Sequence, residues 1–418
     1  MGAPVSQYVS LSIVMFLEYA VWGAWAPVLA ARLLGPLKMT GKQTGWVYAT
    51  LPIACIISPF VAGQLADKWL HTEWILAACH IIGAVLLFAA VRQSTFRGMF
   101  GVMLAYSLCY AATLPLVNAV LFAHVDDPGT QSWVFIWAPV AWALVGYTLT
   151  GWRLLKKQEG DGSDCLVFAG LLSVLMAACC LLLPATPPAG KGGIPIVNAL
   201  AMLQQPDFLV FIVTSLVIAG LMQFYFLGSA RFMIDTGISA KTVPATMAIA
   251  QAAQAAATIL ALGWVLGHFG FKATLTLGAM CWVLLYVAYV LGRPKQLIVG
   301  SQVLHGLAYV MFIIVGQVFA AQVAPEAIRS SMQALIFAAT MGVGLFLGSQ
   351  LAGIVMDKFS VEGRFHWRKI WLVPLVIMLA GTLVMATIFK AEVPKEEKAP
   401  VAQAPAARSS PPLNEGKK

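Results

Sequence analysis

The sequence predicts an all-α membrane protein with twelve transmembrane helices in two six-helix halves. First, 60% of its 418 residues are hydrophobic and only 10% are charged, whereas a soluble domain carries roughly 25% charged residues. Second, twelve apolar runs meet or approach the ~20 residues that a helix needs to cross a bilayer. Third, a long connection rich in Pro and Gly lies between the sixth and seventh runs. A soluble globular enzyme, a disordered protein and a disulfide scaffold are excluded.

The apolar runs divide the chain evenly. We predict helices, with short connections, near residues 8–33, 43–66, 74–91, 98–123, 132–152, 165–183, 207–231, 243–266, 273–291, 296–322, 330–356 and 370–389. The predicted division is an N-terminal half (1–183), a central cytoplasmic linker (184–206), a C-terminal half (207–389) and a tail (390–418). The tail is charged and rich in Ala and Pro, so we expect it to be disordered and cytoplasmic.

The charge and the cysteines of the chain indicate which binding partners to expect. The formal net charge is +9, but the basic residues are scattered over connections, where they set topology rather than bind nucleic acid. The seven cysteines lie in or beside apolar runs without the spacing of a zinc site. No phosphate loop or nucleophile–base pair is evident. We therefore expect no metal, cofactor or enzymatic activity, and a monomer in the lipid bilayer that binds a small solute.

A weak internal repeat supports two related halves. GQLADKW follows the second span and GWVLGHF follows the eighth, 200 residues later. Parallel six-helix halves describe the major facilitator architecture, and GQLADKW resembles the signature of that superfamily. The resemblance implies a latch in which Gly63 lets helices approach and Asp67 caps a neighbouring helix, with Lys68 and Arg329 beside it. The alternative is that Asp67 and Lys68 are a solvated loop pair.

Glu18 is the acidic residue that lies well inside a predicted span. An ionisable group there costs about 2.5–3.5 kcal/mol on insertion scales and needs a reason. A carboxyl group that gains and loses a proton as access alternates could couple transport to protons. The alternative is a permanently neutral Glu18 that is hydrogen-bonded to a neighbouring helix.

Two histidines also fall within predicted spans. His80 lies in the third span and His305 in the tenth. Histidine titrates near neutral pH and can relay protons, so both are candidates for proton coupling. The alternative is that each makes a hydrogen bond between helices.

Neutral amides and aromatic rings supply the candidate substrate ligands. Gln251 and Gln254 are three residues apart and share one helix face. Carboxamides read donors and acceptors together without a charge, although they also join helices across small-residue interfaces. Aromatic rings in mid-span could stack on a planar ligand, or belong to the interfacial belt. The candidates are Gln223, Gln251, Gln254, Asn118, Trp22, Trp25, Trp137 and Tyr309.

Four segments carry a more specific resemblance. LEYAVWGAW in the first span, ADKWLHTEWILAACHIIGAVLLF after the second, TLPLVN in the fourth and APEAIRSSMQ after the tenth resemble the nucleoside–proton symporters of the major facilitator superfamily. The resemblance runs from about residue 10 to 390. It implies uptake of a nucleoside or related polar solute with a proton, by alternating access, across the cell inner membrane. It also implies cytoplasmic termini, although most Lys and Arg residues then lie in external connections, against the positive-inside rule.

The family's substrate site is carried over only in part. Its two glutamines match Gln223 and Gln251. Its other polar residues are replaced. The asparagine of the seventh span aligns with Phe226, and the glutamate that follows in the eighth span aligns with Gln254. The arginine of the fifth span aligns with Phe135, and the acidic residue of the tenth span aligns with Val310. Either Glu18 takes over proton coupling, or the chain is a facilitator of another solute such as a sugar or metabolite, or it is a transporter-like sensor without coupling.

Overall fold

The computed structural model describes residues 5–156, 160–188, 200–325 and 329–391, without the side chains of residues 128–129 and 329–331. In this part of the chain, eleven helical segments are long and apolar enough to cross a membrane. Asp164–Cys180 is a shorter apolar helix of 17 residues. The all-α class and the twelve expected spans are therefore confirmed.

Helices of the first half follow one another with short connections, and several have clear start signals. Thr40 makes a capping box with Gln43 before the second span, and Thr95 caps the fourth, as expected for side chains that accept from free N–H groups. The helices are α1 (Val5–Trp25), α2 (Leu29–Leu34), α3 (Gly41–Lys68), α4 (Thr72–Val91), α5 (Phe96–His124), α6 (Pro128–Phe135), α7 (Trp137–Leu155) and α8 (Asp164–Cys180).

The second half also consists of helices that follow one another along the chain. A β-hairpin with two residues in each strand joins its last two spans. The elements are η1 (Ala201–Gln204), α10 (Pro206–Asp235), α11 (Val243–Leu260), α12 (Leu262–Leu291), α13 (Lys295–Gly300), α14 (Gln302–Ala308), η2 (Tyr309–Ile314), α15 (Val315–Val323), α16 (Arg329–Phe337), η4 (Ala338–Gly344), α17 (Leu345–Lys358), β1 (Ser360–Val361), β2 (Arg364–Phe365) and α18 (Trp367–Thr387).

Several predicted spans are interrupted. The first breaks between α1 and α2 at Pro27, which has no N–H to continue the helix. The eighth ends at Leu260 rather than 266, and α12 begins two residues later and kinks at Gly270, whose φ is +69°. The tenth and eleventh spans contain the π-helical turns η2 and η4. π-Helical turns are rare and often lie at functional sites.

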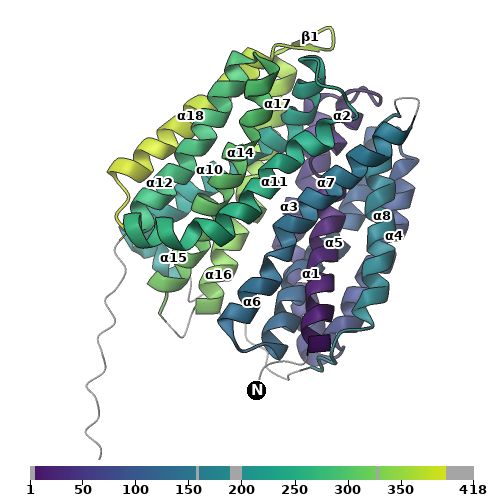
Figure 1. Cartoon of the computed structure of the whole chain (residues 1–418), viewed down its shortest axis with the longest axis vertical. Coiled ribbons are helices and arrows are strands. Elements are labelled where there is room, and N and C mark those ends of the chain that lie inside the picture. The colour runs from purple at the N-terminus through teal and green to yellow at the C-terminus, as the bar shows by residue number, and fades with distance from the viewer. Residues whose placement is uncertain (1–4, 157–159, 189–199, 326–328, 392–418) are drawn as a thin grey trace, which may run out of the picture.

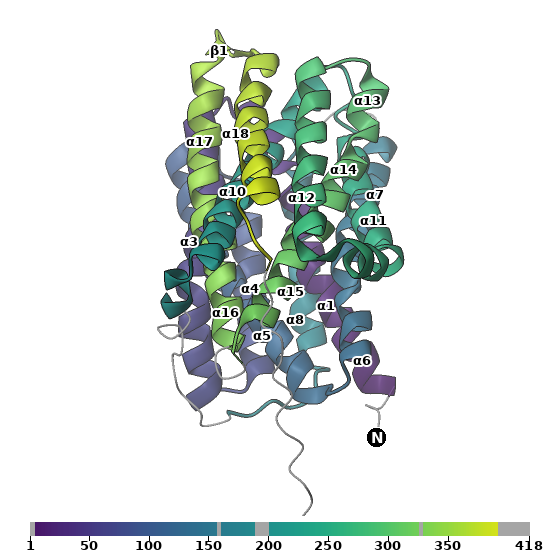
Figure 2. The same cartoon turned by 90° about the vertical axis from the view of Figure 1, so that its left-hand side faces the viewer.

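The two halves lie side by side, purple to blue and green to yellow in Figure 1. They are joined at the face that carries the hairpin, opposite the N-terminus (Figure 2). There Asp357 of α17 accepts from the backbone N–H groups of Gly41 and Lys42 at the start of α3. On the same face, Thr150 accepts from the Ala245 N–H at 2.8 Å. The division into halves with a linker stays a prediction, because residues 189–199 and 392–418 lie outside the described residues.

At the other face, no hydrogen bond or ion pair joins the two halves among the described residues. A Cβ built on Gly63 would meet nothing within 4 Å, and the same holds for Gly263 and Gly267. Leu260 at the end of α11 is 79% exposed. Gly63 therefore makes no close helix contact in this conformation. Asp67 and Lys68 form no hydrogen bond or ion pair with a described residue, so the expected latch stays a prediction. α16 begins at Arg329, whose side chain lies outside the described part.

Candidate functional site

A cavity of about 740 Å³, including its open mouth, lies between the two halves. Both halves line it, through α1, α3 and α7 on one side and α10, α11, α14, η2 and η4 with the start of α17 on the other. The lining includes no Asp, Glu, Lys or Arg. The lining residues are Tyr19, Trp22, Trp25, Ala26, Tyr48, Leu51, Pro52, Ala138, Pro139, Trp142, Met222, Gln223, Phe226, Gln251, Gln254, His305, Tyr309, Met341 and Leu345.

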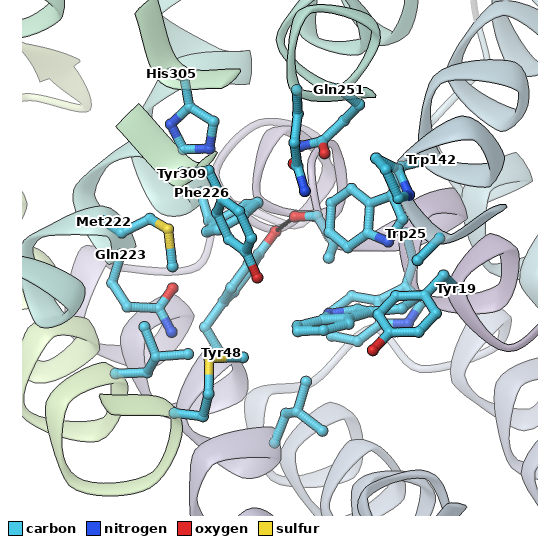
Figure 3. A pocket seen from close by; sticks show the side chains of 18 of the residues that line it. Tyr19, Trp25, Tyr48, Trp142, Met222, Gln223, Phe226, Gln251, His305 and Tyr309 are labelled. Carbon is cyan, nitrogen blue, oxygen red and sulfur yellow. Dashed lines mark hydrogen bonds between the residues drawn. The ribbon is translucent and has the colours of Figure 1, made fainter. Parts of the chain in front are cut away.

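The two walls of the cavity differ in chemistry. The N-terminal half contributes aromatic rings, which Figure 3 shows opposite the amides of the C-terminal half. Trp22 and Trp142 meet edge to face with ring centroids 5.3 Å apart. The indole of Trp25 donates to the Tyr106 hydroxyl at 3.2 Å. Because these rings are held by one another, the wall offers flat apolar faces in a fixed geometry.

The wall of the C-terminal half has free hydrogen-bonding capacity. The Oε1 atom of Gln223 is buried without a hydrogen-bond partner among the described residues. The side chains of Gln251 and Gln254 likewise form no hydrogen bond to a described residue, and neither does the Tyr309 hydroxyl. Since buried polar groups normally have partners, these unpaired groups are suited to bind a polar ligand.

His305 adds a donor of fixed orientation to this wall. The indole N–H of Trp282 donates to Nδ1 of His305 at 3.1 Å. Because an indole N–H can only donate, Nδ1 is the unprotonated nitrogen and Nε2 carries the hydrogen. Nε2 is buried without a partner among the described residues, and the ring stacks on Tyr225 at 3.9 Å. His305 is thus built as a neutral donor.

Close backbone contact brings the polar residues together. A Cβ on Gly306 would lie 2.0 Å from the Ala250 carbonyl oxygen and 2.7 Å from the backbone nitrogen of Gln254. Only glycine therefore allows α14 to lie this close to α11. The contact places His305 beside the helix that carries Gln251 and Gln254.

Glu18 and His80 form a second polar cluster behind the aromatic wall. Glu18 on α1 is 0% exposed, His80 on α4 is 2% exposed, and Oε2 lies 2.9 Å from Nε2. Thr113 on α5 donates to Oε1 of Glu18 at 2.7 Å. On the other side of the imidazole, Ser173 of α8 lies 3.1 Å from Nδ1. Four helices of the N-terminal half meet at this pair.

The structure assembles most of the predicted site residues but separates them into two groups. Trp22, Trp25, Gln223, Gln251, Gln254, His305 and Tyr309 line the cavity, whereas Glu18 and His80 lie behind it. Asn118 and Trp137 are not lining residues, which corrects their assignment to the cavity. At about 100° per residue, Asn118 is turned about 140° around α5 from Thr113, and Trp137 is 37% exposed beside Phe16.

Sequence reasoning missed the partners of the predicted residues. Thr113, Ser173 and Tyr110 surround Glu18 and His80, and Trp282 orients His305. Each is a common residue of membrane helices, so nothing in its own type marks it. Their importance follows only from the helices that meet them.

Comparison with known proteins identifies the family. The family model for the nucleoside H+ symporter matches residues 5–393. The chain belongs to this family. It is 29% identical to the xanthosine permease of Escherichia coli (strain K12) over 91% of this chain and 94% of the relative. It is 27% identical to the nucleoside permease NupG of the same organism, with the same coverage.

Solved structures agree. The crystal structure of the nucleoside transporter NupG matches with a TM-score of 0.81 and 25% identity, over 92% of this chain and 99% of that one. A D-xylose-proton symporter has the same fold, with a TM-score of 0.72 at 15% identity over 93% and 99% of the two chains. The chain is therefore a multi-pass membrane transporter with the major facilitator fold, and its family members are permeases rather than enzymes.

Proposed function

We propose that this symporter-family member takes up nucleosides together with protons, by alternating access of one cavity between its two halves. The contrast between the two cavity walls carries the proposal. A nucleobase has a flat face that stacks on aromatic rings, and an edge that exchanges hydrogen bonds with carboxamides. A nucleoside such as uridine is also uncharged at neutral pH, in keeping with a lining that contains no Asp, Glu, Lys or Arg.

We assign the substrate contacts to the residues with free polar groups. Gln223, Gln251 and Gln254 bind the base edge and the sugar hydroxyls, and Tyr309 contributes its hydroxyl. His305 donates from Nε2. Trp22 supplies a stacking surface with its neighbours on α1 and α7. The proton is carried outside the cavity, by the buried cluster at Glu18 and His80.

The face at which the two halves are not joined defines the conformational state of the transporter. With both termini in the cytoplasm of a bacterial inner membrane, the closed face is external and the cavity opens inward. The cavity is built within a single chain, so a monomer in the lipid bilayer suffices for transport. Gly63, Asp67, Lys68 and Arg329 would then form their latch only when the cytoplasmic face closes.

Uptake of labelled uridine and xanthosine into transport-deficient cells tests the proposal. We expect accumulation that a proton uncoupler abolishes. Gln223→Leu should raise KM roughly three- to tenfold, because it removes a hydrogen bond worth about 0.5–1.5 kcal/mol. Gln350→Leu is the matched control, since Gln350 lies on α17 outside the cavity lining and its removal should leave KM unchanged.

Other outcomes identify the rival functions. Transport of a sugar or metabolite without any nucleoside uptake would make the protein a transporter of a different solute. Nucleoside uptake that the proton uncoupler does not reduce would make the protein a facilitator. If the wild type neither transports nor binds these compounds, a sensor is the better description.

A further inference from the structure

The transported proton needs a site, and the cavity lining contains no carboxylate to hold it. We infer that Glu18, His80 and Ser173 together form the proton-binding site, with the proton taken up at Nδ1 of His80. This inference rests on the proposed function, because it assigns the coupled proton to particular atoms. It also moves the proton away from the substrate, into the interior of the N-terminal half.

The proton-free state has a complete set of hydrogen bonds. Glu18 is a carboxylate that accepts from Nε2–H of His80 at 2.9 Å and from the Thr113 hydroxyl at 2.7 Å. Nδ1 of His80 then has no hydrogen and accepts from the Ser173 hydroxyl at 3.1 Å. The cluster carries one negative charge.

Addition of a proton needs only the rotation of one hydroxyl. The proton binds Nδ1, and the imidazolium then donates from Nδ1 to the Ser173 oxygen and from Nε2 to Glu18. The Ser173 hydroxyl turns to the His80 carbonyl oxygen, which lies within reach at 2.9 Å. One proton enters, the hydrogen bond from the Ser173 hydroxyl to Nδ1 is replaced by one from Nδ1–H to the Ser173 oxygen, and the net charge of the cluster goes from −1 to zero.

The surroundings of the cluster favour this change of charge. A lone buried carboxylate is costly, whereas a buried ion pair with all hydrogen bonds satisfied is tolerated. Besides His80, the titratable groups that face Glu18 from α1 itself and from the neighbouring helices are phenols and thiols, which are neutral near pH 7. They are Tyr19, Cys79, Tyr106, Tyr110 and Cys180. No described residue of α6 or α7 adds a charge there, so the cluster sets its own charge.

Direct contacts connect the proton site to the cavity. The Tyr110 hydroxyl donates to the Glu18 carbonyl oxygen at 2.8 Å, and its ring meets the rings of His80 and Trp22 edge to face. Trp22 lines the cavity. A substrate stacked on Trp22 would therefore contact α1 from the cavity. A proton on His80 would change the charge next to Glu18, on the other side of the same helix.

His305 does not share this design. Its Nδ1 is occupied by the Trp282 N–H, and no carboxylate faces its Nε2 among the described residues. A second proton on this ring would be an uncompensated buried charge. We therefore assign to His305 substrate binding and not proton transport.

Purified protein in proteoliposomes separates the proton site from the substrate site. Counterflow of labelled uridine without a pH gradient measures substrate exchange, and accumulation driven by a pH gradient measures coupling. We expect Glu18→Gln and His80→Gln to retain counterflow but to lose at least tenfold in gradient-driven accumulation, with loss of the nucleoside-dependent signal of an internal pH dye. Glu73→Gln removes another buried carboxylate, on α4 near the connection to α3, and should behave as wild type.

Ser173→Ala provides the second variant, because it removes no charged group. The variant loses a hydrogen bond to Nδ1 in both states, but the bond that the charged imidazolium donates to Ser173 is the stronger one. The proton-bound state is therefore weakened more, so half-maximal uptake should shift to lower pH. Accumulation by Glu18→Gln equal to wild type, or an unshifted pH profile of Ser173→Ala, would overturn the inference. Absence of counterflow in the wild type would instead contradict the proposed function. If the Gln variants do not fold, the Ser173→Ala profile alone decides.

Discussion

Each half of the transporter buries a histidine, and their partners give them different chemistry. His80 in the N-terminal half faces a carboxylate through Nε2 and a hydroxyl through Nδ1. His305 in the C-terminal half receives an indole N–H at Nδ1 and stacks on Tyr225. A hydroxyl can donate or accept, while an indole can only donate. The first environment therefore allows two protonation states and the second only one.

The same contrast extends to the distribution of charge. The N-terminal half holds a titratable pair at its centre, whereas the described carboxylates of the C-terminal half lie at helix ends, such as Asp235 and Asp357, or in the hairpin. Behind the cavity, the C-terminal half instead has a neutral network in which Gln302 joins the hydroxyls of Tyr225 and Tyr289. In our proposal, the N-terminal half carries the proton and the stacking surface, and the C-terminal half supplies the neutral hydrogen-bonding groups for the substrate.

The largest expected effect tests the buried pair by a double-mutant cycle. Glu18→Leu leaves His80 buried without its partner, so we expect a loss of about 3 kcal/mol or more in the free energy of unfolding in detergent. The double variant Glu18→Leu/His80→Leu should be more stable than Glu18→Leu, because no uncompensated polar group remains. Additive losses in the cycle would show that the two side chains do not interact.

A smaller effect concerns the carboxylate of Asp357 at the end of α17. Asp357→Ala removes the acceptor for the free N–H groups at the start of α3, which costs about 0.5–2 kcal/mol for a helix cap. The closed face should open more often. Spin labels at K38C and E362C, on exposed residues of the two halves, should report a larger population of long distances.

The control for this effect is Asp357→Asn. Asparagine caps a helix about as well as aspartate, so this variant should keep the wild-type distance distribution if capping is what matters. An equal shift in both variants would mean that the negative charge itself holds the two halves together.

The third effect tests the fixed orientation of His305. Trp282→Phe removes the N–H that selects the tautomer, so the imidazole no longer presents Nε2–H all of the time. We expect KM for the nucleoside to rise about three- to tenfold while coupling to protons persists. Trp371→Phe is matched in size and burial, and the Trp371 Nε1 has no partner among the described residues. A similar KM for both variants would contradict the role of the Trp282 hydrogen bond.

The spans were predictable because their signal is local. Apolar runs of ~20 residues fix a helix by length alone, and the limits at α4 and α10 agree within four residues with those predicted. The break at Pro27 and the π-helical turns of η2 and η4 were not predicted. A π turn depends on how a helix fits its neighbours, and no residue type marks it.

The site was predictable only as a set of separate residues. The rarity of ionisable groups in the spans singled out Glu18, His80 and His305, but their partners come from contacts between helices up to 95 residues apart in sequence. Asn118 was expected to bind the substrate because a carboxamide offers both donors and an acceptor, but it is not among the residues that line the cavity. Residue type indicates which groups need a partner, and packing decides which partner each receives.

The smallest expected effect concerns a charge of the N-terminal half that lies outside the membrane spans. Asp161, in the connection between α7 and α8, pairs with the buried Arg32 of α2. Partial burial acts to raise the pKa of Asp161, but hydrogen bonds from Ser163 and the charge of Arg32 outweigh it and hold the pKa below its usual value. A depressed pKa means that Asp161 stabilises the fold above about pH 4, and that this contribution is lost as pH falls through the folded-state pKa.

Asp161→Asn should therefore lower the thermal midpoint slightly at pH 7, and the difference from wild type should shrink below pH 4. A difference that is constant from pH 7 to pH 3 would show that the Asp161 charge contributes nothing.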